Sequence, residues 1–268
     1  DQLTIHPHKE REFWMWMSSW ALFVQKPSDL GFSDEGYALP ALDLRWHEVE
    51  ADHESAGHEV FGQARMFRAE AVGVVEAARE KRDSLPARLA KVMELRAEDP
   101  DAHRVIWHDL EAERAALERA IPGIASVYGT QELDLRESIV RDFSNGALPE
   151  LAAKPVMLGS GSNLQRHCAW AIYMGIGHKF NDFIQSIHRL QRFLQTRRVR
   201  VDLIHTTAER GTRRNLERKW QQHIDQMAKM TEIIREYGLS KAAMASTLTR
   251  ALGVKDRIEV SGRSFCIA

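Results

Sequence analysis

The second half of the chain alternates short apolar runs with longer segments of mixed polarity. The apolar runs have the length of buried strands, and the segments between them have the composition of helices. Strands are predicted over 104–107, 124–128, 155–158, 171–174 and 199–204. Helices are predicted over 110–120, 131–143, 180–194 and 209–236. Strands that alternate with helices indicate an α/β fold, in which helices cover both faces of a parallel sheet.

The first hundred residues are less regular and mostly helical in character. An amphipathic helix is predicted over 9–25, where Lys26-Pro27 ends it, and loop residues fill 26–42. A strand could form over 43–50, whereas 51–72 is ambiguous. A helix over 73–98 contains Pro86, either as a break or as a first-turn residue. After the long helix, a further helix is predicted over 240–252, and strand character returns over 254–268.

The charge of the chain is balanced overall but not locally. The net charge is −1 over 268 residues, so composition by itself gives no hint of a nucleic-acid partner. The segment from Arg189 to Lys219, however, contains nine arginines and one lysine but only three acidic residues. Such a cluster is typical of phosphate binding, although a solvated helix face is an alternative for 210–218.

Other features limit the classes of function. Cys168 and Cys266 have no zinc-like or disulfide-like spacing, and a reducing, cytoplasmic setting is expected. The apolar run 13–24 is too short to span a membrane. Its tryptophans are expected to pack in a core or against another lobe, with base stacking as the alternative. The histidines and acids of 47–59 fit no zinc motif, so we expect a solvated acidic segment and no metal.

The predicted helix 180–194 carries the most informative polar pattern. Gln185, Arg189 and Arg192 are spaced by four and three residues, which would place them on one helix face. Arginine offers a permanent charge and a forked donor that suits phosphate, and an arginine beside a γ-phosphate stabilises phosphoryl transfer. An ordinary solvated basic face is the alternative.

The loop Leu158-Gly-Ser-Gly-Ser-Asn163 follows a predicted strand. Its glycines would let the backbone approach a phosphate or ribose, although a simple turn would have the same composition. It is not a P-loop, because no Gly-x4-Gly-Lys-Ser/Thr occurs in this sequence.

In their order along the chain, these pieces resemble the C-terminal lobe of superfamily-two helicases, most closely the Swi/Snf-type branch of bacterial or mobile-element origin. In that family a glycine-rich segment ending in Asn-Leu precedes a helix that reads Gln-x3-Arg-x2-Arg-x-Gly-Gln. Gln185, Arg189, Arg192 and Gln195 match this motif, and Leu194 stands where the family often has glycine. The strand with Trp107 matches the first motif of the lobe. Arg136 and Phe143 fit the family's Arg-x6-Phe pattern.

The resemblance implies a RecA-like fold and a set of site residues. Arg192 would be the arginine finger, Arg189 its companion, and Gln185 would help to position the nucleotide or water. Two further groups are implied by the same resemblance. Nucleotide and DNA contacts would be coupled through Gly159, Gly161, Ser162, Asn163 and Gln195. DNA would be bound by His108, Arg197, Arg198, Arg213 and Arg214.

The resemblance also implies what lies outside the chain. ATP and Mg²⁺ would be bound mainly by an N-terminal helicase lobe of the same full-length protein, and the partner would be DNA. A DNA methyltransferase domain or neighbour is a further partner that relatives suggest. The expected organisation is a helical inter-lobe or insertion region over 1–102, the RecA-like lobe over 103–207, and a helical tail over 208–268 that could lead into a further domain.

The predicted function is therefore that of the C-terminal motor lobe of an ATP-dependent DNA helicase or translocase, inactive as an isolated chain. The alternative is a non-catalytic nucleic-acid-binding or interaction domain with the same fold. The geometry of Arg189 and Arg192 separates the two. A finger needs both guanidiniums exposed on the ligand edge of the sheet, facing the place where a second lobe would dock, whereas arginines held in internal ion pairs would favour the alternative.

Overall fold

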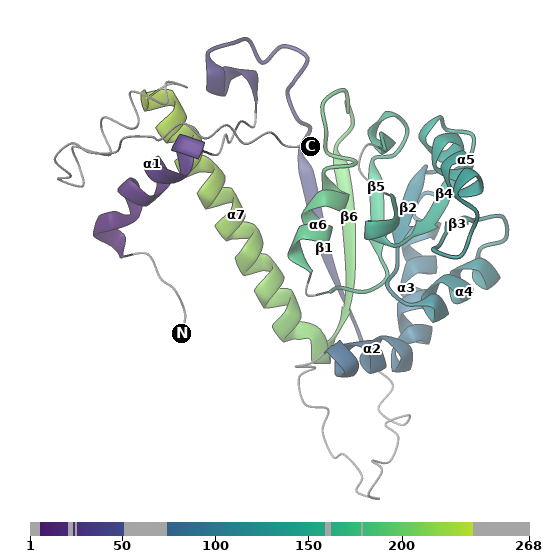
Figure 1. Ribbon diagram of the computed structural model, residues 1–268. Coiled ribbons are helices and arrows are strands. Elements are labelled where there is room, and N and C mark those ends of the chain that lie inside the picture. Colours follow the sequence, from purple (N-terminus) through teal and green to yellow (C-terminus); the bar gives the residue numbers. More distant parts are fainter. Residues whose placement is uncertain are drawn as a thin grey trace, which may run out of the picture. The chain divides into compact units, whose positions relative to one another are not determined.

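The computed structural model describes residues 6–20, 24, 26–50, 74–158, 162–177 and 179–237. The chain folds into two compact units (Figure 1). One is formed by 38–220 and contains the sheet. The other is formed by 1–37 together with 221–268. The predicted helix 240–252, the strand-like end 254–268 and the ambiguous segment 51–72 lie outside the described residues.

The unit 38–220 is built on a six-stranded parallel sheet with the order β1-β6-β5-β2-β4-β3. The strands are β1 (Leu42–Val49), β2 (Arg104–Trp107), β3 (Ala125–Val127), β4 (Glu150–Ala153), β5 (Trp170–Tyr173) and β6 (Val199–Thr206). Every residue of β2, β4 and β5 is buried, as expected for central strands covered on both faces. The α/β class with a parallel sheet, predicted from the apolar runs, is confirmed.

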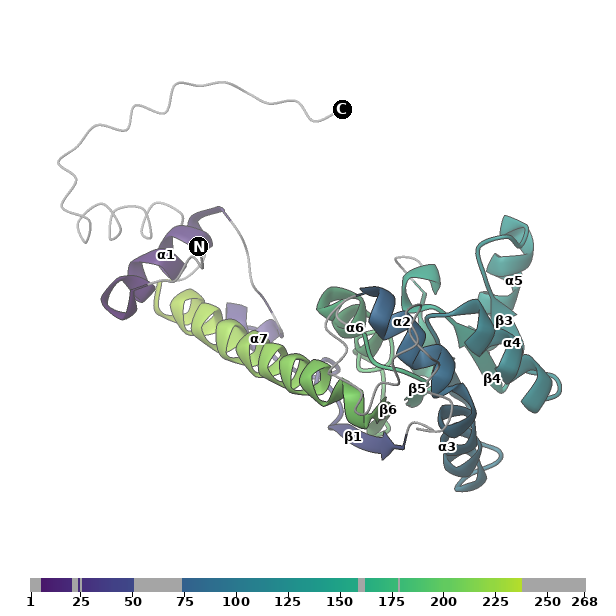
Figure 2. The same ribbon diagram turned by 90° about the horizontal axis from the view of Figure 1, so that it is seen from below.

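Helices cover both faces of this sheet, as Figure 2 shows. They are α3 (Leu85–Ala97), α4 (Glu111–Ala120), α5 (Leu133–Ser144), α6 (Phe180–Ile187) and the start of α7 (Arg210–Tyr237), while α2 (Val74–Asp83) lies at the carboxyl ends of the strands (Figure 1). Phe143 of α5, Phe183 of α6 and Leu216 of α7 belong to the apolar core on one face. Val92 of α3 and Leu117 of α4 belong to the core on the other face. The strands supply alternate residues to the two cores because strand side chains point to opposite faces in turn.

Two predicted elements are wrong in ways that affect the site. The third strand is not at 155–158, which forms a 3-10 turn, η3 (Pro155–Leu158). The strand is β4, five residues earlier. Pro155 lacks an N–H donor, and the Ala-Ala pair of β4 carries too little apolar surface to stand out in the pattern. The helix predicted over 180–194 ends at Ile187, so Arg189 and Arg192 do not belong to it.

The other described elements agree with the prediction to within a few residues, with two refinements. The amphipathic helix is α1 (Glu10–Trp20), and the loop after it holds a short 3-10 turn, η2 (Pro27–Leu30). The helix predicted over 73–98 is two helices, with Pro86 in the first turn of α3. β1 pairs with β6 over eight residues. The sheet therefore includes a strand that the expected organisation grouped with 1–102.

A buried arginine ties together the carboxyl ends of two strands. Arg88 of α3 is fully buried, and its guanidinium donates to the carbonyl oxygens of Met174 and Ile204, just after β5 and within β6. It also donates to Glu209 at 2.6 Å and to the Ser84 hydroxyl at 2.7 Å. Glu209 in turn accepts from the backbone N–H of Thr206. One side chain of α3 thus ties together the carboxyl ends of β5 and β6 and the short turn η5 (Thr207–Glu209).

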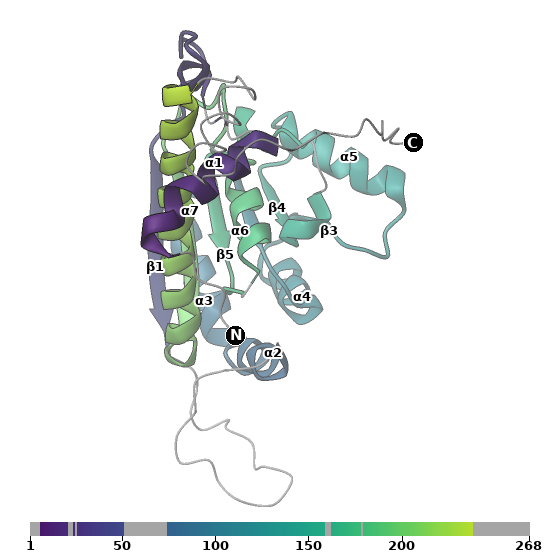
Figure 3. The same cartoon turned by 60° about the vertical axis from the view of Figure 1, so that its left-hand side comes forward.

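The second unit contains a small apolar core between α1 and the C-terminal part of α7 (Figure 3). Trp14 and Met15 of α1 pack with Met230 and Ile233 of α7. Trp14 is therefore a core residue, as expected, while Trp16 is about half exposed at 48%. Within the described part of the chain, no helix combines the length and the apolar character needed to cross a membrane.

Candidate functional site

Arg189 and Arg192 lie in an irregular turn that continues from the end of α6. The turn is closed by backbone hydrogen bonds from Leu190 to Ile187 and from Arg192 to Leu190, and Leu190 is fully buried beneath it. Leu194 takes a left-handed backbone conformation with φ 70°. Glycine adopts this conformation without strain, whereas leucine does not. The backbone here therefore has a conformation suited to glycine although leucine occupies the position.

Both arginines contact the end of the loop that follows η3. Nη1 of Arg189 donates to the Ser162 hydroxyl at 3.1 Å, and Nη1 of Arg192 donates to the Asn163 side-chain oxygen at 3.1 Å. The Ser162 hydroxyl donates to the carbonyl oxygen of Leu158 at 2.9 Å, which fixes this end of the loop. These contacts bring the two predicted catalytic arginines together with two of the predicted coupling residues. Gly159 and Gly161 lie outside the described residues.

The electrostatics of the pair favour an anion. Arg189 is half-buried, which lowers its pKa, and the neighbouring charge of Arg192 lowers it further. Its Nε is buried and has no hydrogen-bond partner among the described residues. Neither arginine forms an ion pair with an acidic residue in the described part of the chain. Guanidinium groups stay protonated in proteins, so a bound anion would relieve both the repulsion and the unpaired donor.

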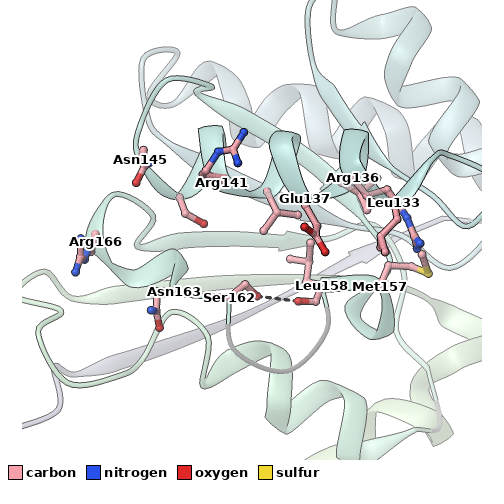
Figure 4. Close-up of a pocket in the computed structure, with 13 residues that line it drawn as sticks. Leu133, Arg136, Glu137, Arg141, Asn145, Met157, Leu158, Ser162, Asn163 and Arg166 are labelled. Atoms are coloured by element: carbon pink, nitrogen blue, oxygen red, sulfur yellow. Dashed lines mark hydrogen bonds between the residues drawn. The ribbon is translucent and has the colours of Figure 1, made fainter.

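A groove of about 520 Å³ lies beside this contact, between α5 and the loop (Figure 4). Arg136 and Arg141 reach it from α5, and Arg166 stands on the opposite side in the short turn η4 (Leu164–Arg166). Ser162 and Asn163 line it as well. Glu137 is the one acidic residue among the described lining residues. The remaining lining residues are Val127, Leu133, Val140, Ser144, Asn145, Met157 and Leu158.

The predicted catalytic residue Gln185 and the predicted coupling residue Gln195 lie elsewhere. Gln185 is exposed on α6, whereas Arg189 lies beyond the end of that helix, so the two do not share one continuous helix face. Gln195 is buried, and its amide donates to the carbonyl oxygen of Cys168 at 2.9 Å while its side-chain oxygen accepts from the N–H of Arg197. The buried side chain of Gln195 therefore joins the turn to the residues just before β5 and is not accessible to a ligand.

The predicted DNA-binding role of His108 does not fit its surroundings. The residue follows β2, and only 2% of it is exposed. Burial, with a smaller effect of the Lys154 charge, lowers its pKa to about 4. The imidazole is thus neutral near pH 7 and offers neither charge nor accessible surface to a phosphate.

The remaining predicted DNA-binding arginines are spread over the unit, and several of them already contact other protein groups. Arg197 is exposed and donates to the carbonyl oxygen of His167. Arg198 lies 3.5 Å from a carboxylate oxygen of Asp43. Arg213 pairs with Glu217, whereas Arg214 is exposed on α7. The basic stretch is balanced further by ion pairs of Arg200 with Glu98 and Asp202, and of Arg210 with Glu48.

Sequence reasoning missed two arginines of the groove. Arg141 and Arg166 gave no signal in the sequence, because they lie twenty-five residues apart and on different elements. They come together because β3 and β4 are neighbours in the sheet, which brings α5 next to the loop after β4. No group of three potential metal ligands occurs among the described residues. His47, in the segment weighed as a metal site, hydrogen-bonds to Asp202 at 2.7 Å.

Comparisons with known proteins give similarities of structure only. No family model matches the sequence, and no curated protein matches it. Among solved structures, the chain is similar to the C-terminal part of the Fun30 ATPase domain, with 17% identity, a TM-score of 0.41, and coverage of 45% of this chain and 41% of that one. It is similar to a DEAD box protein from Methanococcus jannaschii, with 15% identity, a TM-score of 0.44, and coverage of 50% and 37%.

A third similarity is to a chain in the structure of the E. coli DEAD-box protein SrmB bound to regulator of ribonuclease activity A, with 11% identity, a TM-score of 0.45, and coverage of 67% and 85%. The chain thus spans less than half of the length of the first two structures. At these identities and TM-scores the similarities carry no conclusion about activity.

Proposed function

We propose that this chain is the RecA-like C-terminal motor lobe of an ATP-dependent, Swi/Snf-type DNA helicase or translocase. The proposal depends on one observation: Arg189 and Arg192 stand side by side at the loop that ends in Ser162 and Asn163, and their hydrogen-bond acceptors in the described part of the chain are neutral oxygens. Their charge is therefore available to an incoming anion. This is the arrangement that a phosphate-directed arginine needs.

In the proposed function, Arg192 acts on the γ-phosphate of an ATP that a separate N-terminal lobe holds together with Mg²⁺. An arginine placed there offsets the charge that develops on the transferring phosphoryl group. Arg189 supports it from the more buried position. The pair lies between the end of α6 and the amino end of β6, away from the carboxyl edge of its own sheet. The pair is thus not on the ligand edge of the sheet, where the finger was expected.

The groove beside the arginines is the proposed contact with DNA. Three arginines line it against one glutamate among the described residues, and its other polar lining groups are hydroxyls and amides. Such groups bind phosphodiester oxygens without reading base sequence. Ser162 and Asn163 belong both to the groove and to the arginine contact. A DNA strand in the groove would therefore contact Ser162 and Asn163, which hold the two arginines. This supports the proposed coupling between DNA binding and the nucleotide.

The groove also supports the alternative, a nucleic-acid-binding domain without catalysis, because DNA binding needs the groove alone. The absence of ion pairs between Arg189 or Arg192 and any described acidic residue favours the motor lobe. Internal pairing of both arginines would be expected if they served only the stability of the fold.

The decisive experiment uses the longer protein in which this chain is joined to a lobe that carries a P-loop. We expect Arg192→Ala to lower DNA-stimulated ATP turnover by about 10³-fold or more, the usual effect of removing an arginine finger. Nucleotide affinity, measured with a fluorescent ATP analogue, should change little because the N-terminal lobe provides most of the contacts. Arg192→Lys should restore little, since an ammonium cannot reproduce the forked donor.

Arg45→Ala is the matched control, since Arg45 is an exposed arginine on β1 that pairs with Asp43 and belongs to none of the predicted nucleotide or DNA contacts. Its turnover should stay close to that of the parent protein. Unchanged turnover in Arg192→Ala would remove this residue from the mechanism. DNA binding that persists without any DNA-stimulated turnover in the parent protein would establish the alternative.

A further inference from the structure

A second cavity, of about 410 Å³, lies at the carboxyl ends of the central strands. Its walls are the segments that directly follow three strands: Asp109 and Leu110 after β2, Lys154 to Val156 after β4, and Gly175 to Gly177 after β5. The chain leaves β2 toward the β4 side of the sheet and leaves β5 toward the β6 side. Parallel sheets bind small ligands most often at such a reversal. The cavity shares no lining residue with the arginine groove among the described residues.

The inner wall of this cavity is apolar and partly aromatic. Tyr173, Phe183, Leu203 and Leu216 line it, and each is at least nine-tenths buried in the core. The Tyr173 hydroxyl is already hydrogen-bonded to the Ser186 hydroxyl, so this residue offers no polar group to a ligand. At the rim, Val156 is an apolar side chain with 66% of its surface exposed. A wall of this kind suits the flat face of a ring system.

The polar lining of the cavity has an excess of positive charge. Three lysines line it, Lys81, Lys154 and Lys179, against two aspartates in the described part of the wall. Lys81 is 4% exposed and pairs with Asp109, and Lys154 pairs with Glu111 at 2.8 Å. Lys179 is exposed at the start of α6 and has no ion pair among the described residues. Its ammonium is the lining cation left for a ligand, and Asp182, three residues later on α6, is the lining acid without an ion pair among the described residues.

Gly175 preserves the buried lysine at this site. A Cβ on Gly175 would come within 3.0 Å of the Lys81 side chain at Cε and of the Arg88 guanidinium at Nη1. Any larger residue would therefore push on the Arg88 network or displace Lys81 from the cavity. The glycine thus keeps room for the Lys81–Asp109 ion pair in the wall of the cavity.

We propose that this cavity binds a small aromatic anion, a planar apolar body that carries one negatively charged group. The body would lie against Tyr173 and Phe183, and the charged group would lie near Lys179. The volume falls within the range of small-molecule sites, which begins at about 300 Å³. A purine nucleotide and an aromatic carboxylate share this chemistry, and the site is separate from the ATP and DNA contacts of the proposed function.

The test is a titration of the full chain with the fluorescent dye ANS, an aromatic sulfonate. We expect saturable binding of one dye per chain. Ala78→Trp, which places a large ring in the cavity from α2, should abolish it. Lys179→Glu should weaken it about fivefold, the effect of reversing one nearby charge in a largely aqueous setting. The uncharged analogue N-phenylnaphthylamine should bind the parent chain more weakly than ANS does. Its affinity should be the same for the parent chain and for Lys179→Glu.

Controls separate this cavity from other places on the chain. Arg141→Glu reverses a charge in the arginine groove and should leave ANS binding unchanged, and all variants should keep the thermal melting profile of the parent. Displacement of the dye by AMP would identify a nucleotide as the ligand type, and displacement by naphthoate would identify an aromatic acid. Binding that is unsaturable, that resists both competitors, or that is unaffected by Ala78→Trp would overturn the proposal.

Discussion

The fully buried Arg88 provides the sharpest test of how this fold is held together. Replacement by methionine keeps the length and the apolar stem of the side chain but removes the guanidinium. Four hydrogen bonds disappear with it: those to Met174, Ile204, Ser84 and Glu209. The lost contacts join α3 to the ends of β5 and β6. The change therefore acts on the middle of the sheet without leaving a large cavity.

The magnitude follows from what is left behind. Two carbonyl oxygens lose a charged donor, at roughly 1 kcal/mol each. The Glu209 carboxylate, 2% exposed, loses its ion-pair partner while it still accepts from the Thr206 N–H. Removing one partner of a buried ion pair costs about 3–5 kcal/mol. Added together, these losses lead us to expect Arg88→Met to lower the free energy of unfolding by about 5–7 kcal/mol. Arg88→Met combined with Glu209→Gln should cost about 2 kcal/mol less than the two single changes added together.

Urea denaturation followed by tryptophan fluorescence measures this directly, since Trp107 and Trp170 are buried in the sheet. Arg114→Met is the control. Arg114 forms ion pairs with two acids, Glu111 and Glu118, on the surface of α4. Its replacement should lower the free energy of unfolding by less than about 1 kcal/mol. A loss below about 1 kcal/mol in Arg88→Met would refute the assigned role of the network. Equal losses in both variants would refute the distinction between buried and exposed pairs.

Three further predictions concern acid stability, backbone strain and DNA binding. Burial lowers the pKa values of His103 and His108 to about 4, so the unfolded chain binds protons more readily, and unfolding free energy should fall as pH drops from about 6.5 toward 4. Between pH 7.5 and 5 the free energy of unfolding should fall by about 2 kcal/mol because of His108, and by less because of His103, which is only half-buried. In urea titrations at the two pH values, His108→Gln should remove the larger share of this fall. A free energy of unfolding that does not change with pH would contradict the prediction. Leu194→Gly should raise the free energy of unfolding by about 0.5–1 kcal/mol in the same assay, because it relieves a left-handed residue that is 61% exposed; a loss would speak against that backbone conformation. Arg141→Ala should weaken binding of a single-stranded oligonucleotide and reduce the salt dependence of log Kd by about 0.7, as fluorescence anisotropy at several salt concentrations would show; an unchanged slope would exclude a phosphate contact.

The sheet can be predicted from the sequence to the extent that its strands are apolar. β2, β5 and β6 are marked by branched and aromatic residues, and the apolar pattern places each of them to within one or two residues. The pattern misplaces β4 because its sequence, Glu-Leu-Ala-Ala, has little apolar surface of its own. β4 is buried because β2 and β3 flank it. Strand order is a tertiary property, and no local pattern in the chain encodes it.

The sequence proposes residues for the candidate site but not their geometry. The spacing of Arg189 and Arg192 fits a helix face, yet α6 ends before them. The buried Leu190 and the left-handed Leu194 shape an irregular turn in its place. The two arginines nonetheless meet Ser162 and Asn163, since what brings them there is the packing of the turn against the loop. The contact of Arg88 with Glu209, 121 residues apart, has no sequence signal at all.

The chain treats its arginines in two different ways, and the difference supports the proposed site. Arg88 and Arg104 are fully buried, and each is paired with a carboxylate, Glu209 and Glu150 respectively. Such pairing satisfies the charge and leaves nothing for a ligand. Arg189 and Arg192 are held by a hydroxyl and an amide, which fix direction without cancelling charge. An aspartate in place of Asn163 would be nearly the same size and would bind Arg192 more tightly, but it would neutralise the group. Neutral acceptors at this contact are what an arginine needs if its charge is to act on something that arrives from outside the chain.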